Sequence, residues 1–378
     1  MATGGAREQA LPGAHEALSP ESLVAAPPVP KLTVSYRLAR RTLTGAFALG
    51  LFILSLQLMK RGATALNPII DSLHVHGSVN YLGFGWISAY LLGSGSPVAS
   101  VALTLFSRGV LSDTSTYFMI SGGRLGASFI VLFVGFLYYI RGRREPDGLY
   151  IGVVALMTTA FVYAAAIPVG YGLLKSGWLD GVRFGSPGLI RGVNDAYAPV
   201  VDFFAGFMPH LGLFVVGMVA TVISLKLFDA ALPSLESTSP RVRRAVEFFH
   251  RRFTMFVLGI AITVLTVSVA VSLTILVPLS MKGIVRRTNI IPYVMGAQIG
   301  TFVDKLFVSL LLDSPRAFTI VFCEMVAVSG ISLVVLTVCF APFRDSILRL
   351  AHLATRDRRG FALFLGAIFV VPLILLFV

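Results

Sequence analysis

Long apolar runs recur along most of this chain, and they constrain its fold more than any other feature. They begin near Thr42 and continue to Val378, and a membrane-spanning helix needs about 20 such residues. Hydrophobic residues make up 56% of the chain and charged residues only 13%, too few to cover a soluble surface. Because the runs are continuous and do not alternate with polar residues, they favour helices over a transmembrane β-barrel. We therefore expect an all-α integral membrane protein.

The formal net charge of +13 raises the alternative of a nucleic-acid-binding protein. The arginines and lysines, however, lie in short stretches between the apolar runs, as they do in the cytoplasmic loops of membrane proteins. A cytoplasmic N-terminus places most of them on the cytoplasmic side, provided that two interrupted runs re-enter the membrane and do not cross it. The pattern predicts a multi-pass protein of the inner (plasma) membrane, with the lipid bilayer and not nucleic acid as a partner.

Two apolar runs are interrupted by small and polar residues. The run at 80–107 contains Gly-Ser-Gly-Ser-Pro at 93–97, and the run at 253–281 contains several hydroxyl residues and Pro278. Each half of the first run is short for a full span, which favours a re-entrant helical hairpin over the alternative of one kinked helix. We expect seven crossing helices, near 43–59, 114–140, 149–174, 199–228, 289–312, 317–343 and 361–378, plus two hairpins.

The expected organisation follows from these runs. It comprises a disordered cytoplasmic tail at 1–41, a first transmembrane repeat at 42–140 with a hairpin near 80–107, a connecting helix and external loop at 141–197, a second repeat at 198–312 with a hairpin near 253–281, and C-terminal helices at 313–378.

An internal repeat relates the two halves at an offset of 174 residues. Gly122 pairs with Gly296 and Gly126 with Gly300, and no gap is needed back to Ser94. Since the expected hairpins enter from opposite sides of the membrane, the repeats are predicted to be inverted. Inverted repeats with broken helices near the membrane midplane are typical of secondary transporters. The alternative is that the small residues only allow close helix packing.

The segment PLSMKGIVRRTNIIPYVMGAQIGTF at 278–302 resembles the type II sodium-dependent phosphate cotransporter family, and FALGLFILSLQLMKRGATALNP near the N-terminus resembles its first helix. That family has a Gln-Ser-Ser-Ser hairpin motif and a later G-A-N-I-G-T motif, once in each half. The resemblance covers roughly residues 45–135 and 210–312. It implies a secondary active transporter that carries inorganic phosphate by symport with sodium.

The resemblance also implies a set of binding residues. Hydroxyls and backbone amides of the hairpins would bind phosphate oxygens, and the motif asparagine is replaced by arginine in one half and glutamine in the other. The predicted substrate-binding residues, which include Arg124 for its charge within a span, are Ser94, Gly95, Ser96, Ser100, Arg124, Ser268, Thr274, Gln298 and Thr301.

The chain departs from the family at the hairpin motifs. The first Gln-Ser-Ser-Ser falls on residues 93–96 and the second on 267–270, so that Gly93 and Val267 stand where the glutamines should be. Two alternatives therefore remain open. One is a family offshoot that moves another anion or solute without sodium coupling, and the other is a membrane scaffold or sensor that transports nothing.

Charged residues inside the predicted spans are functional candidates, because burying them in a membrane is costly. Arg124 suits an anionic substrate through its guanidinium group, but it suits equally a structural ion pair with Asp304, or a position at the interface. Lys305 follows Asp304 directly and faces about 100° away on a helix, so we expect no close pair between them. Glu324 belongs either to a proton or cation pathway or to a hydrogen bond with a neighbouring helix.

The chain contains no nucleophile motif, phosphate-binding P-loop or dinucleotide fingerprint. We therefore expect neither an enzyme nor an ATP-driven pump. The expected ligands are inorganic phosphate or a related anion and a coupling sodium ion, with no other cofactor.

Overall fold

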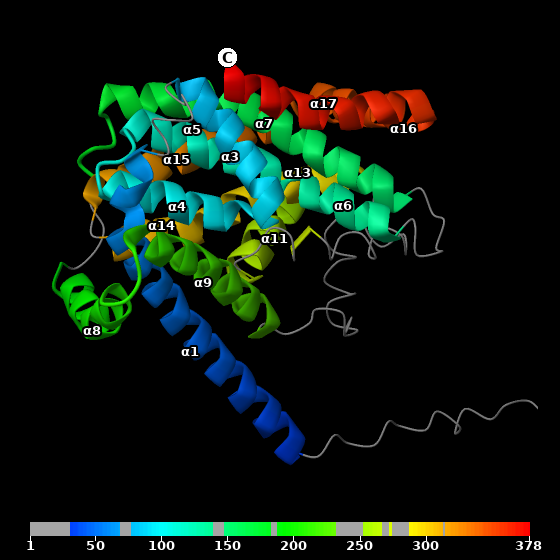
Figure 1. Ribbon diagram of the computed structural model, residues 1–378. Coiled ribbons are helices and arrows are strands. Elements are labelled where there is room, and N and C mark those ends of the chain that lie inside the picture. The colour runs from blue at the N-terminus through cyan, green and yellow to red at the C-terminus, as the bar shows by residue number, and fades with distance from the viewer. Residues whose placement is uncertain are drawn as a thin grey trace, which may run out of the picture.

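The computed structural model describes residues 31–68, 77–138, 147–182, 187–231, 252–266, 272–273, 287–312 and 314–378. The elements formed by these residues are helices, as the continuous apolar runs predict (Figure 1). They are α1 (Lys31–Gly62), η2 (Ala63–Leu66), α3 (Ser78–Leu92), α4 (Gly95–Ser107), α5 (Asp113–Ala127), α6 (Phe129–Tyr138), α7 (Asp147–Ser176), α8 (Pro187–Ala205), α9 (His210–Ala231), α11 (Arg252–Thr266), α13 (Arg287–Gly300), α14 (Phe302–Leu311), α15 (Pro315–Thr337), α16 (Phe340–Arg356) and α17 (Arg358–Phe377).

Within the described residues, seven helical stretches are long and apolar enough to cross a membrane. They are Ala39–Leu66, Asp113–Phe133, Leu149–Ser176, His210–Phe228, Thr288–Leu311, Pro315–Thr337 and Arg359–Phe377. Each overlaps one predicted crossing helix, so the expectation of seven such helices is confirmed at the level of length and composition. α4 and α11 are apolar but shorter.

Three predicted boundaries are wrong. α1 begins at Lys31, so residues 31–41 of the expected disordered tail are helical. The span expected at 199–228 is two helices, because the chain leaves α8 at Ala205 and re-enters a helix only at His210. Pro209 in this gap lacks an N–H group and disfavours helical geometry in the residue before it. The span expected at 317–343 likewise divides, since α15 ends at Thr337.

The predicted interruption of the first run lies between α3 and α4. Gly93 adopts a left-handed conformation with φ of 64°, which glycine tolerates without steric cost. Ser94 is extended, and its side chain accepts a hydrogen bond from the Ser96 amide at 3.4 Å, which caps α4. Two helices separated by a sharp break are thus confirmed here, whereas the path of this segment relative to the membrane stays a prediction. The corresponding break after α11 lies outside the described residues.

The helix pairs α3–α5 and α11–α13 are packed through equivalent glycines. A Cβ atom added to Gly122 would lie 2.0 Å from the Leu82 carbonyl oxygen, and one added to Gly296 would lie 2.0 Å from that of Phe256. Gly296 follows Gly122 by 174 residues, and Phe256 follows Leu82 by the same number. The same correspondence holds for Gly85 against Met119 and Gly259 against Tyr293, and for Gly126 against Trp86 and Gly300 against Ile260. The repeat found in the sequence therefore appears as repeated backbone contacts, while its inverted orientation stays a prediction.

The seven stretches differ in how much of them the rest of the molecule covers. Those containing α5, α7 and α13 are mostly buried, whereas α9 and α17 expose most of their surface. In Figure 1, α16 and α17 form one edge of the bundle, and α8 lies to one side next to α1. Apolar side chains such as Leu265 and Leu363 are exposed on the outer helices, as expected for contact with lipid. Polar residues of α5, α7, α13, α14 and α15 are therefore enclosed at the centre.

Candidate functional site

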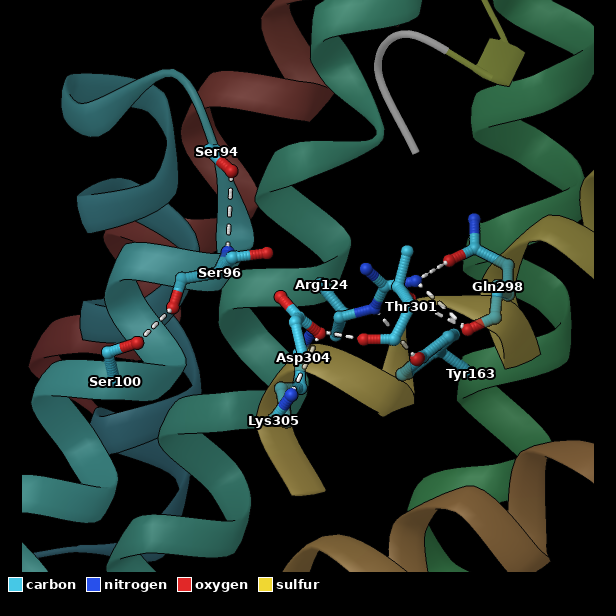
Figure 2. Close-up of polar contacts among 9 residues, drawn as sticks. All are labelled: Ser94, Ser96, Ser100, Arg124, Tyr163, Gln298, Thr301, Asp304 and Lys305. Atoms are coloured by element: carbon cyan, nitrogen blue, oxygen red, sulfur yellow. Dashed lines mark hydrogen bonds and ion pairs between the residues drawn. The ribbon is translucent and has the colours of Figure 1, made fainter. Parts of the chain in front are cut away.

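Arg124 occupies the centre of a buried polar cluster. It belongs to the last turn of α5, and only 3% of its surface is exposed. Its Nε donates to the Tyr163 hydroxyl at 3.2 Å, and its Nη2 donates to the Gln298 backbone oxygen at 3.2 Å and to the Gln298 side-chain oxygen (Figure 2). All three acceptors are neutral, so these contacts orient the guanidinium without neutralising its charge.

The glycines of α5 explain why Arg124 points inward to this cluster. Gly122 lies against α3, and Gly123 lies against α4 next to Val98. Because these close contacts occupy two sides of α5, the next residue is directed away from α3 and α4, toward Tyr163 of α7 and Gln298 of α13, which supply its hydrogen-bond partners. The same small residues that pack the helix pair thus aim a long cationic side chain between the two halves.

Gln298 is the second centre of the cluster. Its Nε2 donates to the Thr159 hydroxyl of α7 at 2.6 Å, and its backbone oxygen accepts from the Thr301 hydroxyl at 2.8 Å as well as from Arg124. The backbone oxygen is available because α13 ends at Gly300 and α14 begins at Phe302. A matching break separates α5 from α6, where the Ser128 hydroxyl donates to the Leu125 oxygen at 2.6 Å.

Asp304 and Lys305 form an ion pair at the edge of the cluster. The Lys305 Nζ lies 3.1 Å from Asp304 Oδ1 and also donates to the Thr301 backbone oxygen at 2.9 Å. The expectation that these adjacent residues would not pair is therefore wrong. The long lysine side chain folds back along α14, which the angle between neighbouring Cα–Cβ bonds does not describe. The predicted alternative of an Arg124–Asp304 bridge is not formed, since Asp304 pairs with Lys305.

One aromatic ring lies close to both buried cations. The Phe302 ring centroid lies 5.9 Å from Arg124 Cζ and 5.9 Å from Lys305 Nζ. Cation–π contacts of this kind partly offset the loss of hydration around each charge. The cluster therefore keeps two positive charges within one buried region.

Glu324 of α15 is the other carboxylate of this region. Its Oε1 accepts a hydrogen bond from the Ser121 hydroxyl at 2.9 Å, and its buried Oε2 has no hydrogen-bond partner. Ser121 stands one helical turn before Arg124 on α5, so the carboxylate is close enough for the charges of Arg124 and Lys305 to act on it.

The structure brings together only part of the predicted site. Arg124, Gln298, Thr301 and Asp304 belong to the cluster, whereas the serines of α4 form a separate group in Figure 2. Ser94 caps α4, and the Ser100 hydroxyl donates to the Ser96 backbone oxygen at 3.0 Å within the same helix. The first residue of α4 still approaches the cluster, because a Cβ on Gly95 would lie 2.7 Å from the Gly123 oxygen. Ser268 and Thr274 lie outside the described residues.

Sequence reasoning missed three members of the cluster, Ser121, Thr159 and Tyr163. Thr159 and Tyr163 are four residues apart in α7 and so share one face of an otherwise apolar span. That spacing was visible in the sequence and would have indicated an inward polar face. Asp202 falls within the crossing helix expected at 199–228, but it lies in α8 with its side chain 64% exposed, and it pairs with Arg61 at 3.5 Å.

Comparison of the chain with protein-family models gives no match, and comparisons with curated proteins and with solved structures give no significant match either.

Proposed function

We propose that this protein is a secondary transporter that moves inorganic phosphate, or a related oxyanion, across the membrane in symport with a cation. The observation that carries the proposal is the state of Arg124. It is a permanent cation, it is almost completely buried, and its described hydrogen-bond partners are the neutral groups of Tyr163 and Gln298. A buried charge without an ionic partner is costly, and this cost supports a role for Arg124 in binding an anion.

The guanidinium chemistry supports an oxyanion as that ligand. Two of the three nitrogens of Arg124 are held by Tyr163 and Gln298, while Nη1 has no hydrogen-bond partner among the described residues. Guanidinium nitrogens donate strong, charge-assisted hydrogen bonds to phosphate oxygens. The fixed orientation leaves Nη1 to donate to a phosphate that enters between the halves, which favours binding at Arg124.

Alternating access is the mechanism that fits this arrangement. We propose that the two repeated helix pairs are inverted relative to one another, with α3 and α4 forming a re-entrant hairpin, and that they rock around the Arg124–Gln298 contact. The breaks at Ser128 and Thr301 lie beside the cluster and interrupt otherwise continuous spans. Such breaks are where transporter helices bend and expose backbone groups to substrate.

The family resemblance implies sodium as that cation. A second candidate, transport of an anion without sodium coupling, is favoured by the sequence departure at Gly93 and Val267, where both motif glutamines are missing. The α4 serines, which match the motif, also lie apart from Arg124. The direct test therefore varies the cation gradient as well as the anion.

The experiment measures uptake of radiolabelled phosphate into proteoliposomes, with and without an inward sodium gradient. We expect uptake that is lost in Arg124→Gln and retained in Arg108→Gln, whose arginine lies at an exposed position and donates to the Lys60 backbone oxygen at 2.8 Å. Unlabelled sulfate and arsenate serve as competitors to define the anion. Folded protein that takes up none of these anions under any gradient would contradict transport of oxyanions.

A further inference from the structure

We propose that Glu324 binds the proton that is co-transported with the anion, so that the coupling ion of this transporter is a proton. The inference rests on the proposed function, because it specifies the cation that accompanies the anion at Arg124. It begins from the one buried carboxylate oxygen among the described residues without a hydrogen-bond partner, Oε2 of Glu324.

Only one of the two carboxylate oxygens of Glu324 has a hydrogen-bond donor beside it. Oε1 accepts from the Ser121 hydroxyl at 2.9 Å, and no lysine or arginine among the described residues forms an ion pair with either oxygen. The residue is 1% exposed, so water does not solvate the remaining charge on the protein surface. An ionised carboxylate in such a position is costly, and a proton bound to Oε2 removes that cost.

The charges nearby make the two protonation states functionally different. Arg124 and Lys305 are positive, while Asp304 and the ionised Glu324 are negative, so their formal charges cancel. Protonation of Glu324 leaves one positive charge in the cluster, which favours an anion beside Arg124. Binding of the proton and binding of the anion therefore assist each other, and linkage requires the assistance to be reciprocal.

Other ionisable groups around Glu324 do not replace it in this role. The groups that act on its charge belong to α5, α7 and α14, and they are Tyr117, Arg124, Tyr163 and Lys305. The Tyr117 hydroxyl donates to the Ile167 backbone oxygen at 2.9 Å, and the Tyr163 hydroxyl accepts from Arg124. Among the described residues, three other helices pack against α15. α4 contains no ionisable side chain, and α13 contains Arg287 as its first residue and Tyr293, whose hydroxyl bonds with Ser272. The ionisable residues of α16 come after the end of α15 in the chain.

The transport cycle then needs only protonation and deprotonation of one oxygen. With the site open to the more acidic side, Oε2 takes up a proton and phosphate binds at Arg124. When the site opens to the other side, phosphate leaves, the cluster loses its negative ligand, and the proton dissociates from Oε2. One proton moves with each anion, in addition to any proton that phosphate itself carries.

The test compares Glu324→Gln with the parent protein in sodium-free proteoliposomes that are acidic outside and contain a pH-sensitive dye. Glutamine keeps the acceptor for Ser121 and imitates a permanently protonated carboxyl group. We expect the parent to accumulate labelled phosphate and acidify the lumen. We expect Glu324→Gln to exchange labelled for unlabelled phosphate but to accumulate much less of it than the parent under the same pH gradient, because its glutamine carries no proton across the membrane.

Because phosphate changes its own protonation near neutral pH, every comparison is made between variants at the same pair of pH values. Asp202→Asn is the matched control, since it removes an exposed carboxylate, and it should accumulate phosphate like the parent. If Glu324→Gln does not fold, Ser121→Ala replaces it. Loss of the donated hydrogen bond disfavours the ionised carboxylate, so accumulation should extend to higher pH.

The outcomes separate the two proposals. Gradient-driven accumulation by Glu324→Gln equal to that of the parent overturns proton coupling at this residue, as does a pH dependence in Ser121→Ala identical to that of the parent. Accumulation that follows a sodium gradient and ignores the pH gradient assigns the coupling to sodium and also overturns the inference, while leaving phosphate transport intact. Absence of phosphate exchange in the folded parent protein contradicts the proposed function itself.

Discussion

Nη2 of Arg124 lies 3.2 Å from the backbone oxygen of Gln298, the residue that occupies the equivalent position 174 residues later in the repeat. In the proposed inverted arrangement one axis relates the two repeats, and equivalent residues contact each other only near that axis. In that arrangement the contact marks the junction of the two halves. A transporter whose halves move against each other would hold its substrate at this junction, and the first two predictions concern these two residues.

Arg124→Lys should weaken phosphate binding by roughly tenfold to a hundredfold. Lysine keeps the charge, but its single ammonium group cannot bond Tyr163 and Gln298 and still present a fixed donor to the anion. Loss of one charged hydrogen bond costs about 1.5–3 kcal/mol. Titration calorimetry with purified protein measures the affinity. Arg108→Lys, at an exposed position, is the matched control and should bind phosphate normally; equal affinities in the two variants would contradict the assignment.

Gln298→Glu should abolish phosphate binding without loss of thermal stability. The new carboxylate lies against the Arg124 guanidinium and neutralises the charge that the anion needs, while forming an ion pair within the fold. If Arg124 had only a structural role, Gln298→Glu would leave phosphate transport unchanged. Uptake and thermal unfolding are measured on the same preparation. Asn80→Asp adds a carboxylate on α3, away from the cluster, and should leave the affinity for phosphate unchanged.

Lys305→Met should destabilise the protein by about 3–5 kcal/mol, because Asp304 is then left as a buried charge without its cation. The double variant Asp304→Asn with Lys305→Met should recover most of this loss, since neither charge remains. Denaturant or thermal unfolding in detergent gives both values and completes a double-mutant cycle. Losses that simply add would show that the ion pair contributes nothing to the stability of the fold.

Gly122→Ala and Gly296→Ala should each lower stability by about 1–3 kcal/mol through overpacking. The added methyl group would lie 2.0 Å from a backbone oxygen in both cases, so the neighbouring helix must move. Gly330→Ala is the matched control, because a Cβ at that position meets nothing within 4 Å. We expect the two variants to lose the same amount of stability, because Gly122 and Gly296 make equivalent contacts in the two repeats. A change tolerated at only one of the two positions would mean that the halves are not packed alike.

Much of the fold was predictable from local features of the chain. The apolar runs determined the number of membrane-length helices, because an isolated backbone in lipid must satisfy its own hydrogen bonds and does so as a helix. The glycine offset predicted which positions of the two halves correspond, and the glycine contacts at Gly122 and Gly296 agree with it. The break at Gly93 followed from a residue that tolerates positive φ. Pro209 was a signal for the break between α8 and α9. The prediction overlooked it because the apolar residues continue through this region.

The pairing of the polar residues was decided by the tertiary structure. Arg124 had plausible partners on several helices, and the choice of Tyr163 and Gln298 depends on which faces of α5, α7 and α13 meet. Ser121 and Glu324 are 203 residues apart in the chain, and no local sequence pattern predicts their hydrogen bond. The sequence alone thus determined the helices, their repeat and the presence of charges within them. Only the packing of the helices decided which charges are paired. A buried charge is stabilised by a polar or charged group close to it, and the neighbouring helices determine which group that is.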